Sequence, residues 1–125
     1  MSDQPTLIFV YGTLKDRGRL DALLKGICRW HAINEGTVQG RLYDVGPYPA
    51  LVVSDDSGGR VPGLLIELES VDALARLDAY EGVAEGLYMR RHMPVRRVDG
   101  TTDYAWVYVY CRSVEQLPRI AAWTK

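Results

Sequence analysis

The chain has few cysteines and few histidines, which limits the kinds of site that it can build. Its 125 residues include only Cys28, Cys111, His31 and His92. Two thiols so far apart do not make a disulfide framework, and reduced thiols are the simpler interpretation. Cys28 and His31 form a lone C-x-x-H, which needs two further ligands to hold zinc. We therefore expect no metal site, and the histidines give little support to a Ser-His or Cys-His hydrolase.

Long apolar segments and an excess of one charge are also missing. No apolar run approaches the ~18–20 residues that cross a bilayer, and residues 1–6 lack the regions of a signal peptide. The formal net charge is −1, so overall charge does not attract the protein to nucleic acid or to an anionic membrane. Glycine-rich phosphate loops and a G-x-S-x-G elbow are absent. We expect a cytoplasmic protein with no nucleic-acid or membrane partner and no cofactor.

What remains is typical of one globular domain over residues 1–125. The chain is 47% hydrophobic and 25% charged, and a domain of this length can bury a core without disulfides or metal. It has one Phe but eight Tyr and three Trp. Tyr-rich concave surfaces suit small polar ligands, because the ring is apolar while the hydroxyl seeks a hydrogen bond.

Short apolar runs separated by Gly and Pro predict a chain in which strands dominate. We predict strands at 7–11, 37–45, 50–53, 61–68, 88–98 and 104–111, with helices at about 18–26 and 70–80. Turns are predicted at 55–59 and 99–100, and the last residues resemble a loosely packed tail. Because strands and helices do not alternate regularly, we expect an α+β fold, namely a small mixed β-barrel, closed or half-closed, with flanking short helices.

The first candidate site is the loop Tyr11-Gly12-Thr13-Leu14-Lys15, which follows the first predicted strand. Successive backbone N–H groups in such a glycine turn can converge on an anion such as a carboxylate. The alternative is a simple connection between strand and helix with Thr13 as the cap, and the local pattern alone favours it. Both interpretations remain open at this point.

The second candidate is Glu81, near the end of the second predicted helix. It follows Leu77 by four residues and Leu74 by seven, so it continues the apolar stripe and should point inward. Burial, the negative end of the helix dipole and nearby Asp78 would all raise its pKa. A carboxylate tuned in this way suits general acid/base catalysis near neutral pH. The alternative is a solvated glutamate at a frayed helix end.

The helix that carries Glu81 has recognisable end signals. Ser70 is a credible N-cap, and Gly82 can adopt the left-handed conformation that ends a helix.

The third candidate is the strand face shared by Tyr88, Arg90 and His92, with Arg96 and Arg97 further along. Alternate residues of a strand point the same way, so this face could bind an anionic substrate. The simpler interpretation, which we prefer, is an edge strand that its charges protect from aggregation. Pro94 agrees with an edge or a bulge.

Taken in order, the motifs resemble the γ-glutamylcyclotransferase-like family, of the γ-glutamylamine cyclotransferase type. The resemblance rests on 9–14 (Phe-Val-Tyr-Gly-Thr-Leu), 48–52 (Tyr-Pro-Ala-Leu-Val), 61–63 (Val-Pro-Gly), 77–82 (Leu-Asp-Ala-Tyr-Glu-Gly), 88–90 (Tyr-Met-Arg) and 107–110 (Val-Tyr-Val-Tyr). It covers nearly the whole chain and implies a compact mixed barrel with flanking helices.

The resemblance also implies an activity and a site. It implies an enzyme that cleaves a small-molecule γ-glutamyl amide by intramolecular cyclisation, releasing 5-oxoproline and a free amine or amino acid. The catalytic glutamate of the family falls on Glu81, and the substrate-holding loop falls on Tyr11, Gly12, Thr13 and Leu14. Tyr88 is expected to line the pocket, and Arg90 to be structural.

Two other functions stay open. The first is a non-catalytic module that binds a small ligand or a protein on the same fold, since fold does not imply function. The second is an amide hydrolase in which Glu81 acts on water, which would release glutamate in place of 5-oxoproline.

Overall fold

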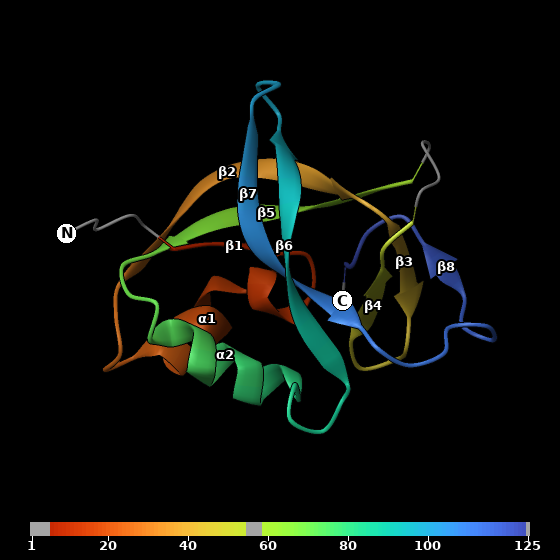
Figure 1. Cartoon of the computed structure of the whole chain (residues 1–125), viewed down its shortest axis with the longest axis horizontal. Helices are drawn as coiled ribbons and strands as arrows, with labels where there is room; N and C mark the ends of the chain where they lie inside the picture. Colours follow the sequence, from red (N-terminus) through yellow and green to blue (C-terminus); the bar gives the residue numbers. More distant parts are fainter. Residues whose placement is uncertain (1–5, 55–58, 125) are drawn as a thin grey trace.

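The fold is a closed five-stranded barrel with a small second sheet and two helices (Figure 1). It was obtained as a computed structural model, which describes residues 6–54 and 59–124. The described strands are β1 Thr6–Val10, β2 Trp30–Gln39, β3 Arg41–Asp44, β4 Pro49–Val52, β5 Arg60–Leu68, β6 Tyr88–Arg97, β7 Thr102–Tyr110 and β8 Arg119–Ile120. The helices are α1 Arg17–Leu24, α2 Ala73–Glu81 and the 3-10 turn η1 Thr13–Lys15. The predicted α+β mixed barrel is confirmed.

The barrel closes through one parallel contact. Its strands run in the order β1-β5-β2-β6-β7, all paired antiparallel except β1 with β7, which meet at Ile8 and Trp106. Two glycines face each other where β2 and β5 pair, Gly36 and Gly63. A Cβ atom at Gly63 would lie 2.4 Å from the Val10 carbonyl oxygen. Glycine is therefore required where β5 passes so close to β1.

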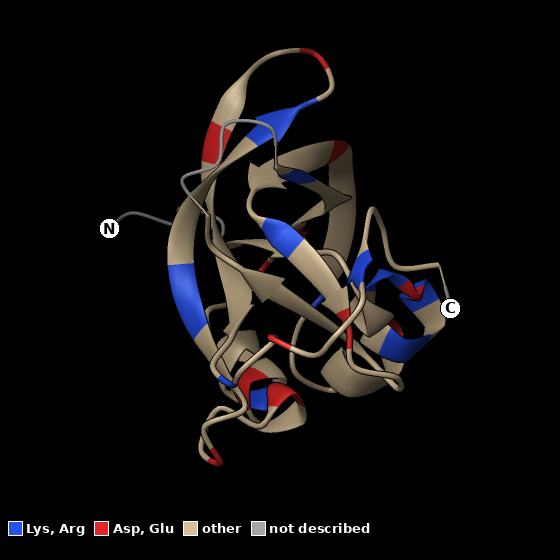
Figure 2. Ribbon diagram, turned by 90° about the vertical axis from the view of Figure 1, so that its right-hand side faces the viewer, with Lys and Arg blue, Asp and Glu red and all other residues tan. Residues whose placement is uncertain are grey.

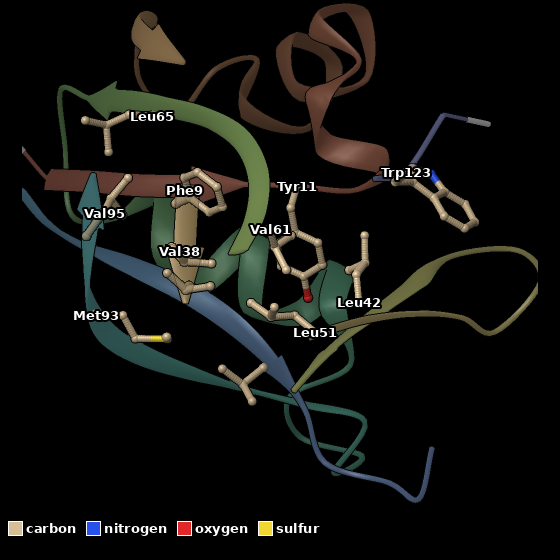
Figure 3. Packing of buried hydrophobic residues seen from close by; sticks show 13 residues of the cluster. Phe9, Tyr11, Val38, Leu42, Leu51, Val61, Leu65, Met93, Val95 and Trp123 are labelled. Carbon is tan, nitrogen blue, oxygen red and sulfur yellow. The ribbon is translucent and has the colours of Figure 1, made fainter. Parts of the chain in front are cut away.

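The barrel wall separates two hydrophobic cores, which is why its central strands are apolar on both faces. The interior core is shown in Figure 3 and includes Phe9, Val38, Leu65 and Val95, each at most 1% exposed. The second core lies between the outer wall and the helices, and it is built largely from aliphatic side chains. Its buried members are Ile8, Val10, Leu14, Leu20, Leu24, Ile66, Leu68, Ala73, Leu74, Leu77, Tyr88 and Tyr108.

The strand predicted at 37–45 is wrong in its bounds. The chain is extended from Trp30 and breaks at Gly40, where β2 of the barrel ends and β3 of the second sheet begins. A Cβ at Gly40 would lie 2.7 Å from the Val52 carbonyl oxygen, so the crossing between sheets needs a glycine.

The loosely packed tail is also wrong for the described part of the C-terminus. Arg119 and Ile120 form β8, which pairs with β3. Trp123 is 4% exposed and belongs to the interior core (Figure 3). The Lys15 ammonium donates to the Trp123 carbonyl oxygen at 2.6 Å, so the C-terminal segment is attached to the loop that follows β1.

The helix ends follow the predictions in part. α2 ends as predicted at Gly82, which is left-handed with φ 71°. Its N-cap is Asp72 and not Ser70, whose hydroxyl instead accepts a hydrogen bond from the Asp72 N–H. α1 is capped by Asp16, whose carboxylate accepts from the N–H groups of Gly18 and Arg19, so Thr13 is not the cap.

Several further expectations concern the remaining segments. The hairpin at Asp99-Gly100 joins β6 to β7 as predicted, whereas the turn at 55–59 lies, apart from Gly59, outside the described residues.

Acidic and basic residues are interspersed along the ribbon (Figure 2). Both cysteines are free thiols. In the described ranges, no helix is long and apolar enough to cross a membrane.

Candidate active site

A pocket lies where the end of β1, the end of α2 and the start of β6 meet. It brings together all the residues predicted for the site, Tyr11 to Leu14, Glu81 and Tyr88. Its full lining is Phe9, Val10, Tyr11, Gly12, Thr13, Leu14, Tyr48, Pro49, Glu81, Tyr88 and Tyr108. Segments up to about a hundred positions apart therefore contribute to one site.

The loop after β1 forms the floor of the pocket because Gly12 allows close packing. A Cβ atom there would lie 2.7 Å from Pro49 Cγ, inside the van der Waals limit. The next residues form η1, whose hydrogen bonds run from Lys15 N to Gly12 O and from Asp16 N to Thr13 O. The N–H groups of Thr13 and Leu14 belong to the first turn and have no partner within it.

Glu81 is a pocket carboxyl whose pKa is raised to near neutrality. It is the last residue of α2, half-buried, and it lines the cavity together with aromatic rings. Burial raises the pKa of its carboxyl to about 7, because the charged form loses solvation there. Glu81 lies in the pocket lining, in agreement with the predicted inward orientation. Burial is the cause that raises its pKa, and Asp78 makes no contribution.

Asp78 is instead occupied by partners on the barrel. Its carboxylate accepts from Arg90 Nε at 2.8 Å and Nη2 at 3.1 Å, and from the Tyr108 hydroxyl at 2.7 Å. Burial alone would raise the pKa of Asp78, but these donors hold it below its usual value. The carboxylate stays charged and paired, one helical turn before Glu81.

Three tyrosines shape the walls as neutral hydroxyls. Tyr11 donates to the Tyr108 carbonyl oxygen at 2.5 Å, and Tyr88 donates a short hydrogen bond to the Pro49 carbonyl oxygen. Burial is the main cause that raises the pKa of Tyr11, Tyr88 and Tyr108 well above the ordinary value. These hydroxyls therefore remain protonated at neutral pH and hold the pocket walls in place.

Arg90 and His92 share a face with Tyr88, as predicted, but neither lines the pocket. Arg90 is bound to Asp78 and lies 4.5 Å above the Trp106 ring, while His92 lies 4.8 Å from the same ring. The expectation that Arg90 is structural agrees with these contacts. Anion binding on this face has no support from the pocket geometry.

Sequence reasoning did not assign Tyr48, Pro49 or Tyr108 to the site. Tyr48 and Pro49 belong to the 48–52 segment that carries part of the resemblance, and a glycine at position 12 is a sign that another segment packs closely there. Tyr108 was visible only as one residue of an alternating strand. Metal-ligand geometry is also absent from the described residues, where no three His, Cys, Asp or Glu side chains cluster.

Comparison with known proteins identifies relatives of this architecture. The family model described as gamma-glutamyl cyclotransferase, AIG2-like, matches residues 8–125. No curated protein matches the sequence significantly.

Solved structures share the fold at low sequence identity. An AIG2-like protein from Mus musculus is 22% identical with a TM-score of 0.81, and the match covers 97% of this chain and 89% of that one. A protein from Arabidopsis thaliana is 26% identical with a TM-score of 0.69, covering 93% and 75%. A gamma-glutamyl cyclotransferase is 16% identical with a TM-score of 0.70, covering 93% and 70%.

The close approach of Gly12 and Pro49 predicts the effect of one added methyl group. We expect Gly12→Ala to lower the free energy of unfolding by about 1–3 kcal/mol, the usual cost of overpacking. Gly18→Ala is the matched control, since its Cβ would meet only Asp16 Oδ1 at 3.4 Å and α1 gains helix propensity. Urea denaturation measures both, and equal stability of the two variants would contradict the packing argument.

The raised pKa of Glu81 predicts a pH-dependent stability difference. In the unfolded chain this carboxyl has the ordinary glutamate pKa of 4.5, whereas in the folded chain it holds the proton up to about 7. The stabilisation from this tighter proton binding is complete below pH 4.5 and is lost as pH rises to 7. We therefore expect Glu81→Gln to gain stability relative to wild type between pH 5 and 8, by up to about 3 kcal/mol.

Urea denaturation of wild type and Glu81→Gln at pH 5 and at pH 8 measures this difference in stability. Glu85→Gln, in the exposed loop after α2, is the control. If the difference in free energy of unfolding between wild type and Glu81→Gln stays constant with pH, the pKa of Glu81 is not raised by burial.

Proposed function

The chain belongs to the AIG2-like gamma-glutamyl cyclotransferase family, and on that premise we propose that it converts a γ-glutamyl amide into 5-oxoproline and a free amine or amino acid. The observation that carries the proposal is Glu81, a carboxyl with a pKa of about 7 in a pocket lined by the loop after β1. A group that titrates near 7 can both accept and return a proton at neutral pH.

The reaction needs no nucleophile from the protein. The α-amine nitrogen of the γ-glutamyl group attacks its own γ-carbonyl carbon, which forms the ring bond, and the bond from that carbon to the leaving nitrogen breaks. The α-ammonium must first lose a proton, because at pH 7 it is mostly charged. Glu81 takes a proton from this nitrogen and donates one to the leaving nitrogen. The second proton passes through water, and the leaving group departs as an ammonium.

The loop after β1 would bind the reacting group. The N–H groups of Thr13 and Leu14 at the start of η1 offer donors for a negatively charged oxygen of the substrate. The side chain of Leu14 is buried in the core beneath the helices, so its contribution would come from the backbone. Tyr88 and Tyr48 would form one wall beside the glutamyl chain, since both line the pocket and their rings pack edge to face with centroids 6.1 Å apart.

Holding the glutamyl chain curled contributes to the rate as well. Ring closure within one bound molecule is a proximity effect, and a rigid pocket keeps the amine close to the carbonyl. The pocket walls are fixed by the hydrogen bonds of Tyr11 and Tyr88 described above. The cytoplasmic location expected from the sequence stays a prediction.

The test is 5-oxoproline release from a panel of γ-glutamyl amides, followed by chromatography of both products. We expect wild type to form 5-oxoproline from at least one member. Glu81→Gln should lower kcat by about 100-fold or more, since general acid/base groups contribute 10²–10⁴.

A circular dichroism spectrum and an unfolding curve establish that Glu81→Gln is folded, and Glu85→Gln should keep full activity. Release of glutamate in place of 5-oxoproline would identify a hydrolase. Binding without any product would favour a ligand-binding module and remove the role of Glu81.

A further inference from the structure

Arg19 lies beside the pocket, held there through the residue that precedes Glu81. Its Nη1 donates to the Tyr80 hydroxyl at 2.8 Å. The Tyr80 hydroxyl lies 3.1 Å from Thr13 Oγ1, within hydrogen-bond distance. Thr13 lines the pocket, so the Arg19 guanidinium is two hydrogen bonds from the pocket wall.

Arg19 forms none of the close ion pairs found within the described part of the chain, although the nearby Asp16 carboxylate contributes to raising the pKa of Arg19. Arg19 is exposed, and the salt bridges found there join other residues. The carboxylate of nearby Asp16 accepts from the backbone N–H groups of Gly18 and Arg19. A guanidinium has five N–H donors, so the bond to Tyr80 leaves most of them open to a ligand.

Arg19 lies on the side of the pocket toward which a leaving group would extend. Glu81 has to reach the leaving nitrogen to protonate it, and Glu81 lines the pocket while remaining partly exposed to solvent. A leaving group that extends from Glu81 toward solvent passes the side of the pocket formed by Thr13. Tyr80 contacts Thr13 on that side, and Arg19 contacts Tyr80.

We propose that Arg19 is a specificity residue that binds a carboxylate on the leaving group, so that a γ-glutamyl amide with such a carboxylate is preferred over an otherwise matched amide without one. This proposal rests on the cyclotransferase function proposed above. The planar guanidinium matches a carboxylate with two parallel hydrogen bonds. The Tyr80 hydroxyl orients the arginine before substrate binds, which reduces the conformational entropy lost on binding.

The experiment compares γ-glutamylalanine with γ-glutamylalanine amide, which differ only in the charge of the leaving group. Wild type should release 5-oxoproline from the acid with a kcat/KM about fivefold higher, the effect of one exposed ion pair. Arg19→Gln should remove this preference, chiefly by raising KM for the acid. High salt should reduce the preference in wild type, because an exposed pair is screened.

Two variants separate this role from a structural one. Arg17→Gln, a change of an exposed arginine at the start of the same helix, should keep the wild-type preference. Arg19→Lys should keep part of it, because the charge remains while the paired hydrogen bonds are lost.

Equal kcat/KM for the two substrates in wild type would overturn the proposal, and so would an Arg19→Gln variant that slows both substrates equally. Either result leaves the cyclotransferase function intact, because 5-oxoproline still forms. Absence of 5-oxoproline from every γ-glutamyl amide would instead overturn the proposed function, and this inference with it.

Discussion

Asp78 accepts hydrogen bonds from Arg90 on β6 and Tyr108 on β7, and this contact fixes the end of α2 against the barrel. A helix that packs through aliphatic side chains alone can slide or rotate, whereas a bidentate arginine pair specifies one orientation. Glu81 lies one turn further along α2, so its position in the pocket depends on this pairing. The guanidinium of Arg90 also lies 4.5 Å from the centre of the Trp106 ring, a cation–π contact that further restricts it.

The carboxyl of Glu81 lies in the pocket at a position where burial destabilises its charged form. The energetic cost of that burial is what brings the pKa of Glu81 to about 7. Surrounding groups do not relieve the cost, since Tyr11 and Tyr88 direct their hydroxyls to carbonyl oxygens of Tyr108 and Pro49. The protein therefore gives up stability at neutral pH in the same residue that supplies the proposed acid/base chemistry.

Much of this arrangement could be predicted from the sequence, because it depends on local periodicity. The inward orientation of Glu81 followed from the stripe of Leu74 and Leu77, and its helix ended at Gly82 as expected. The first part of β2 could not be found, since its pairing with β5 shifts between Ala32 and Asn34 and the alternation is lost.

The partners of Asp78 could not be predicted either, because they lie 12 and 30 positions away in the chain.

The most direct test of the account is the pKa of Glu81, measured by NMR titration of the side-chain carboxyl carbon, with Glu81→Gln identifying the signal. The account predicts a midpoint near pH 7. A midpoint near 4.5, the ordinary value for glutamate, would mean that the carboxyl is solvated and would contradict the role assigned to it.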